Sequence, residues 1–191
     1  LLPRILRDTA LSRTMILSVA APDGAAAAAG RALADALRAH PALDWVRSGK
    51  GPVLLDIDGG IARLRLNRPD AANGMSAELL SALCDAIMVC HGQPGLRVLL
   101  LSGEGTNFCA GGDVRAFASK GEKLPDYIRQ ATAYLQNAVT GLLRLEAPVI
   151  TSVQGFAAGG GGFGLVCASD IVIAGESAKF LAGATRVAMA P

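Results

Sequence analysis

The chain has 191 residues, a length that fits one domain, and 51% of them are hydrophobic, which is enough for a sizeable core. Its 18 basic and 16 acidic residues give a formal net charge of +2, and only 4% of residues are aromatic. A dedicated nucleic-acid-binding protein concentrates basic charge on one face, so this balance predicts no nucleic-acid partner.

The cysteines and histidines argue against two common kinds of site. The four cysteines form no C-x-x-C pair and there are only two histidines, so no metal site is predicted. Four cysteines in a chain this long do not indicate a disulfide framework, so we expect reduced thiols and a cytoplasmic protein. No apolar run approaches the roughly 18 residues that a membrane-spanning helix needs, and no membrane partner is expected.

Residues 1–52 differ from the rest of the chain and are predicted to be a leader, disordered or helical. A helix-like segment at residues 31–38 leads to Pro41, which ends a helix because proline lacks the amide donor. Three arginines before the short apolar run at residues 15–21 allow a weak secretory signal as one interpretation. A short strand or disordered segment is favoured there, because the cysteine content indicates a reducing compartment.

The body of the chain, residues 53–191, alternates predicted strands and helices. Residues 53–57 and 61–66 are separated by the tight-turn sequence Asp-Gly-Gly, and this arrangement predicts a β-hairpin. Ser76 is a suitable N-cap for the helix that follows, whose apolar residues recur on one face until Gly92.

Strands, glycine-rich segments and helices then recur in that order. A helix is predicted to begin near Asp113, and a long one is predicted to follow Pro125. Three further apolar runs are predicted to be strands: residues 97–102, buried on both faces, residues 148–153, also buried, and residues 171–174. The repetition of strand, loop and helix places the chain in the α/β class.

Two glycine-rich segments are the most informative feature of the sequence. Residues 103–113 follow one predicted strand and residues 154–163 follow another, and each is interpreted as a loop that leads into a helix. Glycine permits close backbone approaches, and a helix N-terminus presents unpaired N–H groups with a partial positive charge. Two such loops that face each other would supply two amide donors to one oxygen, which is the arrangement of an oxyanion hole.

Three other interpretations of these segments compete. A dinucleotide-binding G-x-G-x-x-G fingerprint fails because Phe108 stands where the third glycine belongs. A phosphate-binding P-loop requires a lysine that neither segment has. Tight packing turns without a ligand stay open on spacing alone, because a glycine-rich loop is weak evidence by itself.

Four motifs occur in order along the body of the chain. They are Asn67-Arg68-Pro69 with Asn73, then Phe108-Cys109-Ala110-Gly111-Gly112-Asp113, then Pro148-Val149-Ile150 with the second glycine segment, and finally residues 170–174 with 176–180. Together they resemble the enoyl-CoA hydratase/isomerase (crotonase) family over about residues 53–191. The resemblance implies a crotonase-like (ClpP/crotonase) fold, a repeated β-β-α spiral with two roughly perpendicular sheets, whose C-terminal helical part is missing from this sequence.

The resemblance also implies roles for individual residues. The catalytic groups would be the backbone amides of Gly112 and Gly160, and counting backward from Asp170 would select Gly161 in place of Gly160. Asp113 is in addition expected to cap the helix that it precedes. The residues implied to line the substrate channel are Arg68, Ala71, Asn73, Ala110, Gly111, Asp113, Val114, Arg115 and Gly161.

The sequence departs from the family pattern at the acids. Hydratases of this family use two glutamates, which would fall near Phe163 or Gly164 and near Ala184, and none of these residues is acidic. Residues 185–191 instead resemble the segment that leads into Pro-Asp-Gly-Gly in acyl-CoA isomerases of the phenylacetate-pathway type. The resemblance therefore implies an Asp directly after Pro191 as the proton-moving group, and it favours an isomerase.

The function implied by the resemblance is an enzyme that stabilises an acyl-CoA thioester enolate and shifts a double bond. The alternatives that stay open are an enoyl-CoA hydratase, a thioester hydrolase, and a non-catalytic acyl-CoA-binding remnant. No separate cofactor is implied, because CoA arrives as part of the substrate. A full-length member would form a homotrimer or a dimer of trimers.

Overall fold

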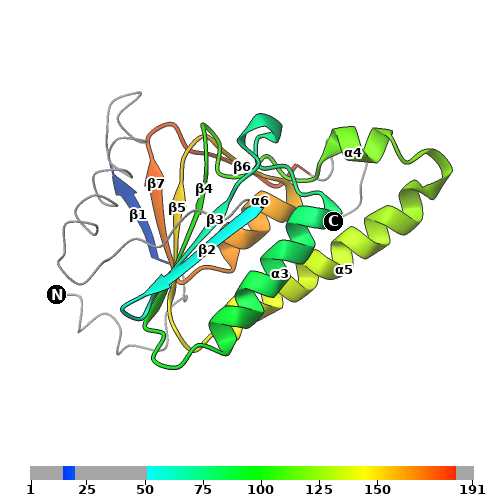
Figure 1. The fold of residues 1–191 in the computed structure, drawn as a ribbon. Coiled ribbons are helices and arrows are strands. Elements are labelled where there is room, and N and C mark those ends of the chain that lie inside the picture. The colour runs from blue at the N-terminus through cyan, green and yellow to red at the C-terminus, as the bar shows by residue number, and fades with distance from the viewer. Residues whose placement is uncertain (1–14, 20–50, 184–191) are drawn as a thin grey trace.

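The computed structural model describes residues 15–19 and 51–183. A six-stranded sheet forms the centre of the fold, with the strand order β1-β7-β5-β4-β3-β2 (Figure 1). Neighbouring strands run parallel except in the β2–β3 hairpin. The strands are β1 Met15–Val19, β2 Val53–Asp58, β3 Ile61–Leu66, β4 Val98–Gly103, β5 Val149–Val153 and β7 Ile171–Gly175.

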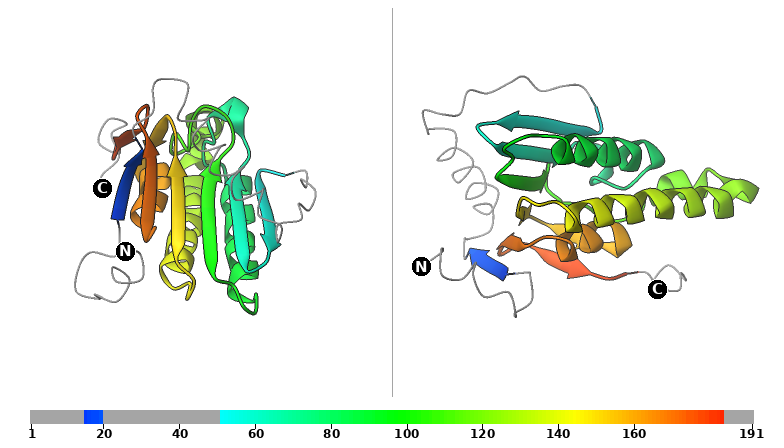
Figure 2. Two further views of the ribbon diagram at one scale, coloured as in Figure 1. Left: turned by 90° about the vertical axis from the view of Figure 1, so that its left-hand side faces the viewer. Right: turned by 90° about the horizontal axis from the view of Figure 1, so that it is seen from below.

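Helices cover one face of this sheet (Figure 2). Helices α3 and α5 pack against each other, and α4 with the first half of α5 extends beyond the sheet (Figure 1). The helical segments are η1 Pro69–Ala71, α3 Ala77–His91, α4 Val114–Ala118, η2 Gly121–Lys123, α5 Leu124–Leu143 and α6 Gly159–Cys167. A second, small sheet pairs β6 Phe156–Ala158 in parallel with β8 Lys179–Leu181.

The core lies between the sheet and these helices. Parallel pairing places Ala62 beside Leu99 and Leu64 beside Leu101, and all four side chains are at most 1% exposed. The prediction that β4 is buried on both faces is wrong. Leu100, on the opposite face, stays partly exposed, because α3, α5 and α6 pack against one face of the sheet.

Most predicted elements are confirmed, and local signals explain them. The β2–β3 hairpin turns at two glycines with positive φ, Gly59 and Gly60, which a tight turn requires. The hydroxyl of Ser76 accepts a hydrogen bond from the N–H of Leu79 at 3.3 Å and caps the start of α3, and Gly92 is the C-cap at its other end. The predicted long helix α5 and strands β4, β5 and β7 are also present.

The second glycine segment differs from the prediction of a loop. Residues 156–158 form β6, and the four glycines at residues 159–162 form the first turn of α6. Tertiary packing explains this, since a Cβ at Gly162 would lie 2.3 Å from the carbonyl oxygen of Cys109. The glycines therefore let the helix backbone approach its neighbours more closely than any other residue would allow.

Part of the predicted leader joins the sheet. Strand β1 pairs in parallel with β7, with Met15 opposite Ile171. The helix-like segment at residues 31–38 and the predicted helix end at Pro41 lie outside the described residues.

The side chain of Asn73 fixes the first glycine segment to the end of β3. Its Oδ1 accepts a hydrogen bond from the backbone N–H of Arg68 at 2.8 Å. Its Nδ2 donates to the carbonyl oxygens of Glu104, Asn107 and Phe108 at 2.9, 2.9 and 3.0 Å. Asn73 is fully buried and has a φ of 53°, a left-handed conformation that asparagine tolerates better than most residues.

Replacement of Asn73 by Asp tests this anchor. The Asp side chain would place a buried carboxylate against three carbonyl oxygens, so we expect the free energy of unfolding to fall by about 3–5 kcal/mol. The matched control is Asn137→Asp on α5, where the side chain is exposed and the expected change is about 0.5 kcal/mol or less. Urea unfolding followed by circular dichroism measures both, and equal losses would contradict the anchoring role.

Candidate active site

The two glycine segments lie side by side although they are far apart in the sequence. Cys109 and Ala157 form a parallel bridge. The N–H of Cys109 donates to the carbonyl of Phe156 at 2.9 Å, and the N–H of Ala158 donates to the carbonyl of Cys109 at 2.9 Å. A Cβ at Gly111 would lie 2.8 Å from the carbonyl oxygen of Ala158, so glycine is required for this approach.

The segment before α3 supports the first glycine segment from its other side. Met75 and Gly112 form a parallel bridge, in which the N–H of Met75 donates to the carbonyl of Gly111 at 2.8 Å. The N–H of Asp113 donates in turn to the carbonyl of Met75 at 3.3 Å. Since C=O and N–H point in opposite directions across a trans peptide, the N–H of Gly112 points away from Met75.

Gly112 is an exposed residue, and its amide lies close to the start of α6. Within residues 51–183 the N–H of Gly112 has no hydrogen-bond partner. A Cβ at Gly159, the first residue of α6, would lie 3.3 Å from the Cα of Gly111 and 3.9 Å from the N of Gly112. The Gly112 amide and the N-terminus of α6 are therefore neighbours.

The N-terminus of α6 offers further amides. Its N-cap residue, Ala158, has no side chain that could bond to the first-turn N–H groups. Gly160 is exposed, and a Cβ there would have no heavy atom of another segment within 4 Å. Gly161 is buried, and a Cβ there would lie 2.4 Å from the Sδ of Met75. Gly160 is therefore the more exposed of the two candidate donors, and the choice between them stays a prediction.

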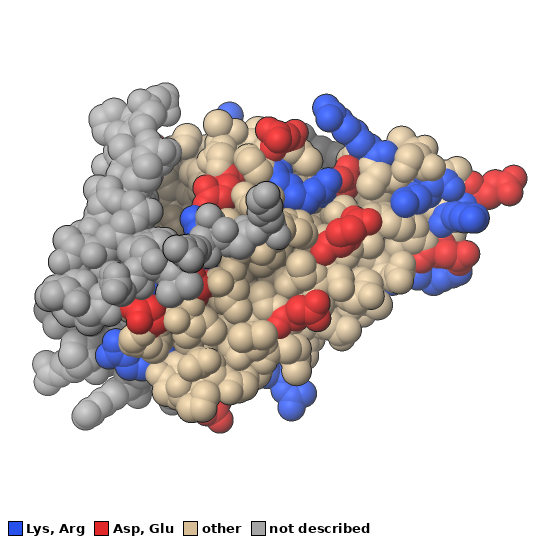
Figure 3. Space-filling model, viewed as in Figure 1, with Lys and Arg blue, Asp and Glu red and all other residues tan. Residues whose placement is uncertain are grey.

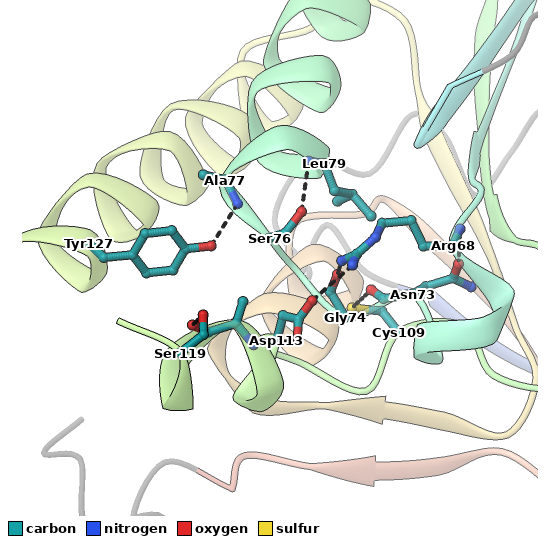
Figure 4. Close-up of polar contacts among 11 residues, drawn as sticks. Arg68, Asn73, Gly74, Ser76, Ala77, Leu79, Cys109, Asp113, Ser119 and Tyr127 are labelled. Carbon is teal, nitrogen blue, oxygen red and sulfur yellow. Dashed lines mark hydrogen bonds and ion pairs between the residues drawn. The ribbon is translucent and has the colours of Figure 1, made fainter. Parts of the chain in front are cut away.

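Arg68 forms an ion pair with Asp113 (Figure 4), the residue that follows Gly112 in the sequence. The Nη2 of Arg68 donates to Oδ2 of Asp113 at 2.9 Å, and its Nη1 donates to the carbonyl of Gly74. Oδ1 of Asp113 accepts from the N–H of Ala116 at 3.0 Å, which confirms the predicted helix cap. Burial raises the pKa of Asp113 and is the largest influence, but the hydrogen bonds from Ala116 and Arg68 and the charge of Arg68 outweigh it and lower the pKa.

The other residues that the resemblance implies to line a substrate channel differ in their exposure to solvent. Ala110, Val114 and Arg115 are exposed on either side of Gly112, where a ligand could reach them. Ala71 is half-buried in η1, and Gly111 is buried. The side chain of Asn73 already pairs all its polar atoms inside the protein, as described above. The substrate-binding roles of these residues stay predictions.

Cys109 belongs to the first glycine segment, pairs with the second and is fully buried. Its thiol donates to the carbonyl of Asn73 at 3.1 Å and accepts from the N–H of Gly111 at 3.4 Å. Burial raises the pKa of this thiol to about 11, so it is neutral at physiological pH. It therefore does not supply a nucleophile to the site.

Phe163 stands at one of the two positions, Phe163 or Gly164, near which the resemblance puts the first glutamate. Phe163 lies on α6 one turn after Gly160, and its ring centroid is 6.2 Å from that of Phe180 on β8. Gly164 adds no acid, and the second expected position, Ala184, lies outside the described residues, as do residues 185–191.

Sequence reasoning missed the contacts that hold α4 in place. The hydroxyl of Tyr127 on α5 accepts a hydrogen bond from the N–H of Ala77 at 3.0 Å, and its ring packs edge-on against Phe117 at 6.0 Å. The Nζ of Lys120 lies 4.5 Å from the centroid of the Tyr127 ring. A single tyrosine on an amphipathic helix gives no sequence signal for such a role.

Other kinds of site find little support in the part of the chain that the structure describes. There, no three His, Cys, Asp or Glu side chains gather as a metal site, and no helix has the length and apolarity to cross a membrane. On the face shown in Figure 3, acidic and basic side chains are interspersed rather than gathered in one basic patch.

Comparison with known proteins identifies the family. Residues 56–191 match the family described as Enoyl-CoA hydratase/isomerase. The chain is 34% identical over 141 residues to 1,2-epoxyphenylacetyl-CoA isomerase of Escherichia coli (strain K12), covering 73% of this chain and 53% of that protein. It is 33% identical over 136 residues to a probable enoyl-CoA hydratase of Rhodobacter capsulatus, covering 71% and 51%.

Solved structures agree with this family. The crystal structure of an enoyl-CoA hydratase from Mycobacterium smegmatis matches with a TM-score of 0.67 and 31% identity, covering 73% of this chain and 54% of that one. A crotonase-family structure from Legionella pneumophila matches with a TM-score of 0.68 and 27% identity, covering 74% and 54%. The chain spans about half the length of the curated relatives it matches. It has the crotonase fold and belongs to the enoyl-CoA hydratase/isomerase family.

Proposed function

We propose that this chain binds an acyl-CoA thioester, holds the thioester carbonyl oxygen on the backbone amides of Gly112 and Gly160, and shifts a double bond in the acyl group. The observation that carries the proposal is the meeting of the two glycine segments. It brings the amide of the exposed residue Gly112, which has no hydrogen-bond partner within residues 51–183, next to a helix N-terminus that has no side-chain cap.

The chemistry follows from where charge develops. Removing a proton from the carbon next to a thioester carbonyl places negative charge on the carbonyl oxygen. Two fixed N–H donors stabilise this charge, and loss of one such donor typically lowers the rate by about 10²–10³-fold. Isomerisation then needs only one further group, which takes a proton from one carbon and returns it to another.

The aromatic pair of Phe163 and Phe180 favours isomerisation over hydration. Hydration needs acidic groups that position and activate a water molecule, and the place of the first one carries a phenyl ring. Sequence identity to the relatives does not distinguish isomerisation from hydration. Besides matching the probable enoyl-CoA hydratase of Rhodobacter capsulatus, the chain is 30% identical over 142 residues to trans-2-decenoyl-[acyl-carrier-protein] isomerase of Streptococcus mutans. That match covers 73% of this chain and 53% of that protein.

Product analysis tests the reaction type. With a 3-enoyl-CoA as substrate, we expect conversion to the conjugated 2-enoyl-CoA, seen as a rise in near-ultraviolet thioester absorbance with no change in mass. A product heavier by one water would indicate a hydratase, and free CoA thiol would indicate a hydrolase. Binding without any product would indicate an acyl-CoA-binding remnant and would contradict the enzymatic proposal.

Replacement of Gly112 by Pro tests the oxyanion role. Proline removes the N–H, so we expect the turnover number to fall by about 10²–10³-fold relative to Gly112→Ala. Alanine is the matched control because it keeps the N–H, and a Cβ in either variant meets Cζ of Phe117, at 2.6 Å in the present geometry. Equal turnover numbers in the two variants would show that the Gly112 amide is not a donor to the substrate.

A further inference from the structure

We propose that Arg68 is a positioning residue for the Gly112 amide. Its guanidinium binds the carbonyl of Gly74 on one side of the Met75–Gly112 bridge and the side-chain carboxylate of Asp113 on the other, and thereby aims the Gly112 N–H. This inference rests on the proposed function, since it assigns a purpose to the direction of that amide. It also gives Arg68 a role inside the protein, in place of the contact with substrate that the family resemblance implies.

The bridge decides where the Gly112 N–H points. The N–H of Met75 donates to the carbonyl of Gly111, and the carbonyl of Met75 accepts from the N–H of Asp113. The peptide groups on either side of Gly112 are therefore both hydrogen-bonded to Met75. A slip of this bridge by one residue would turn the Gly112 N–H toward Met75 and remove it from the exposed edge. Whatever fixes the register of the bridge therefore fixes the donor.

Arg68 holds the two ends of this bridge together. One arm of its guanidinium binds the carbonyl of Gly74, directly before Met75, and the other binds the carboxylate of Asp113, directly after Gly112. The guanidinium is planar and presents its donors in a rigid fork, so it sets the spacing between its two partners. A flexible ammonium group cannot do the same with equal precision.

The environment makes this pair more rigid than a surface ion pair. The side chains of Arg68 and Asp113 are 28% and 10% exposed, whereas those of Arg129 and Asp126, a pair on α5, are 75% and 77% exposed. The backbone of Arg68 is itself fixed, because its N–H donates to Asn73 and its carbonyl accepts from the N–H of Asn73 at 2.9 Å. The guanidinium therefore extends from a fixed point.

The charge of Arg68 also suits an anionic transition state. Asp113 follows Gly112 directly, and its lowered pKa keeps it ionised at neutral pH. An unpaired carboxylate there would repel negative charge on an oxygen held by Gly112. The guanidinium, 2.9 Å from that carboxylate, offsets the repulsion.

Enolate formation by a bound 3-oxoacyl-CoA, acetoacetyl-CoA, tests the proposal. Its enolate absorbs in the near ultraviolet, so the enolate fraction of the bound ligand reports how well the amides stabilise the oxyanion. We expect Arg68→Lys to lower that fraction by about 10-fold and Arg68→Gln to lower it further, with the Kd of the ligand changed by about 3-fold or less. The matched control is Arg129→Lys, which alters an exposed Arg–Asp pair and leaves the fraction unchanged.

A measurement without ligand adds an independent readout. In a spectrum of protein labelled with ¹⁵N-glycine, the resonance that disappears in Gly112→Ala is that of Gly112. This resonance is expected to shift in Arg68→Lys and to stay in place in Arg129→Lys. Asp113→Asn keeps a side chain that caps helices well but removes the charge, so it tests the same link if the Arg68 variants do not fold.

The outcomes separate this inference from the proposed function. An absence of enolate signal in the unsubstituted protein overturns the oxyanion proposal, and the role of Arg68 falls with it. A normal signal there, with an unchanged enolate fraction and Gly112 resonance in the Arg68 variants, overturns the positioning role alone. A large loss of affinity at an unchanged enolate fraction also overturns it, because Arg68 would then contact CoA directly.

Discussion

The site depends on the hydrogen bonds that the buried side chain of Asn73 makes with the first glycine segment. Its amide group pairs with the carbonyls of Glu104, Asn107 and Phe108 and with the N–H of Arg68. These bonds join the segment after β3 to residues 104–108. These bonds are costly to leave unmade in a buried position. They place the segment so that Met75 on one side and Ala157 on the other can pair with it.

Glycine residues then allow the first glycine segment to pack against the segment before α3 and against the second glycine segment. Their backbones meet with no room for side chains. Beyond the contacts of Gly111 and Gly162, a Cβ at Gly103 would lie 2.4 Å from the carbonyl oxygen of Phe108. Four glycines in the first turn of α6 carry an intrinsic cost of about 1 kcal/mol each relative to alanine. Packing between the segments offsets this cost, and it leaves the helix N-terminus open beside Gly112.

Local signals explain which parts of the fold could be predicted from the sequence. The hairpin turn, the cap at Ser76 and the cap at Asp113 each depend on neighbours within four residues, so the residue types suffice. The helical state of residues 159–162 depends on Met75 and Cys109, which are far away in the chain, and the sequence alone predicts a loop. The pairing of Arg68 with Asp113 spans 45 residues and has no local signal. The glycine segments themselves suggest a pair of amide donors, but family resemblance was needed to select Gly112 and Gly160, because a backbone donor leaves only a glycine in the sequence.

The same pair of amides would serve hydration, isomerisation or hydrolysis of a thioester, so the reaction depends on the group that moves the proton. The first glycine segment contains two carboxylates, and each is already paired with an arginine, Glu104 with Arg65 at 2.7 Å and Asp113 with Arg68 at 2.9 Å. The lowered pKa of Asp113 makes it a weak base, and the raised pKa of Cys109 keeps its thiol neutral. The glycine segments therefore supply donors without an acid–base group, and in the proposed reaction that group comes from elsewhere in the enzyme.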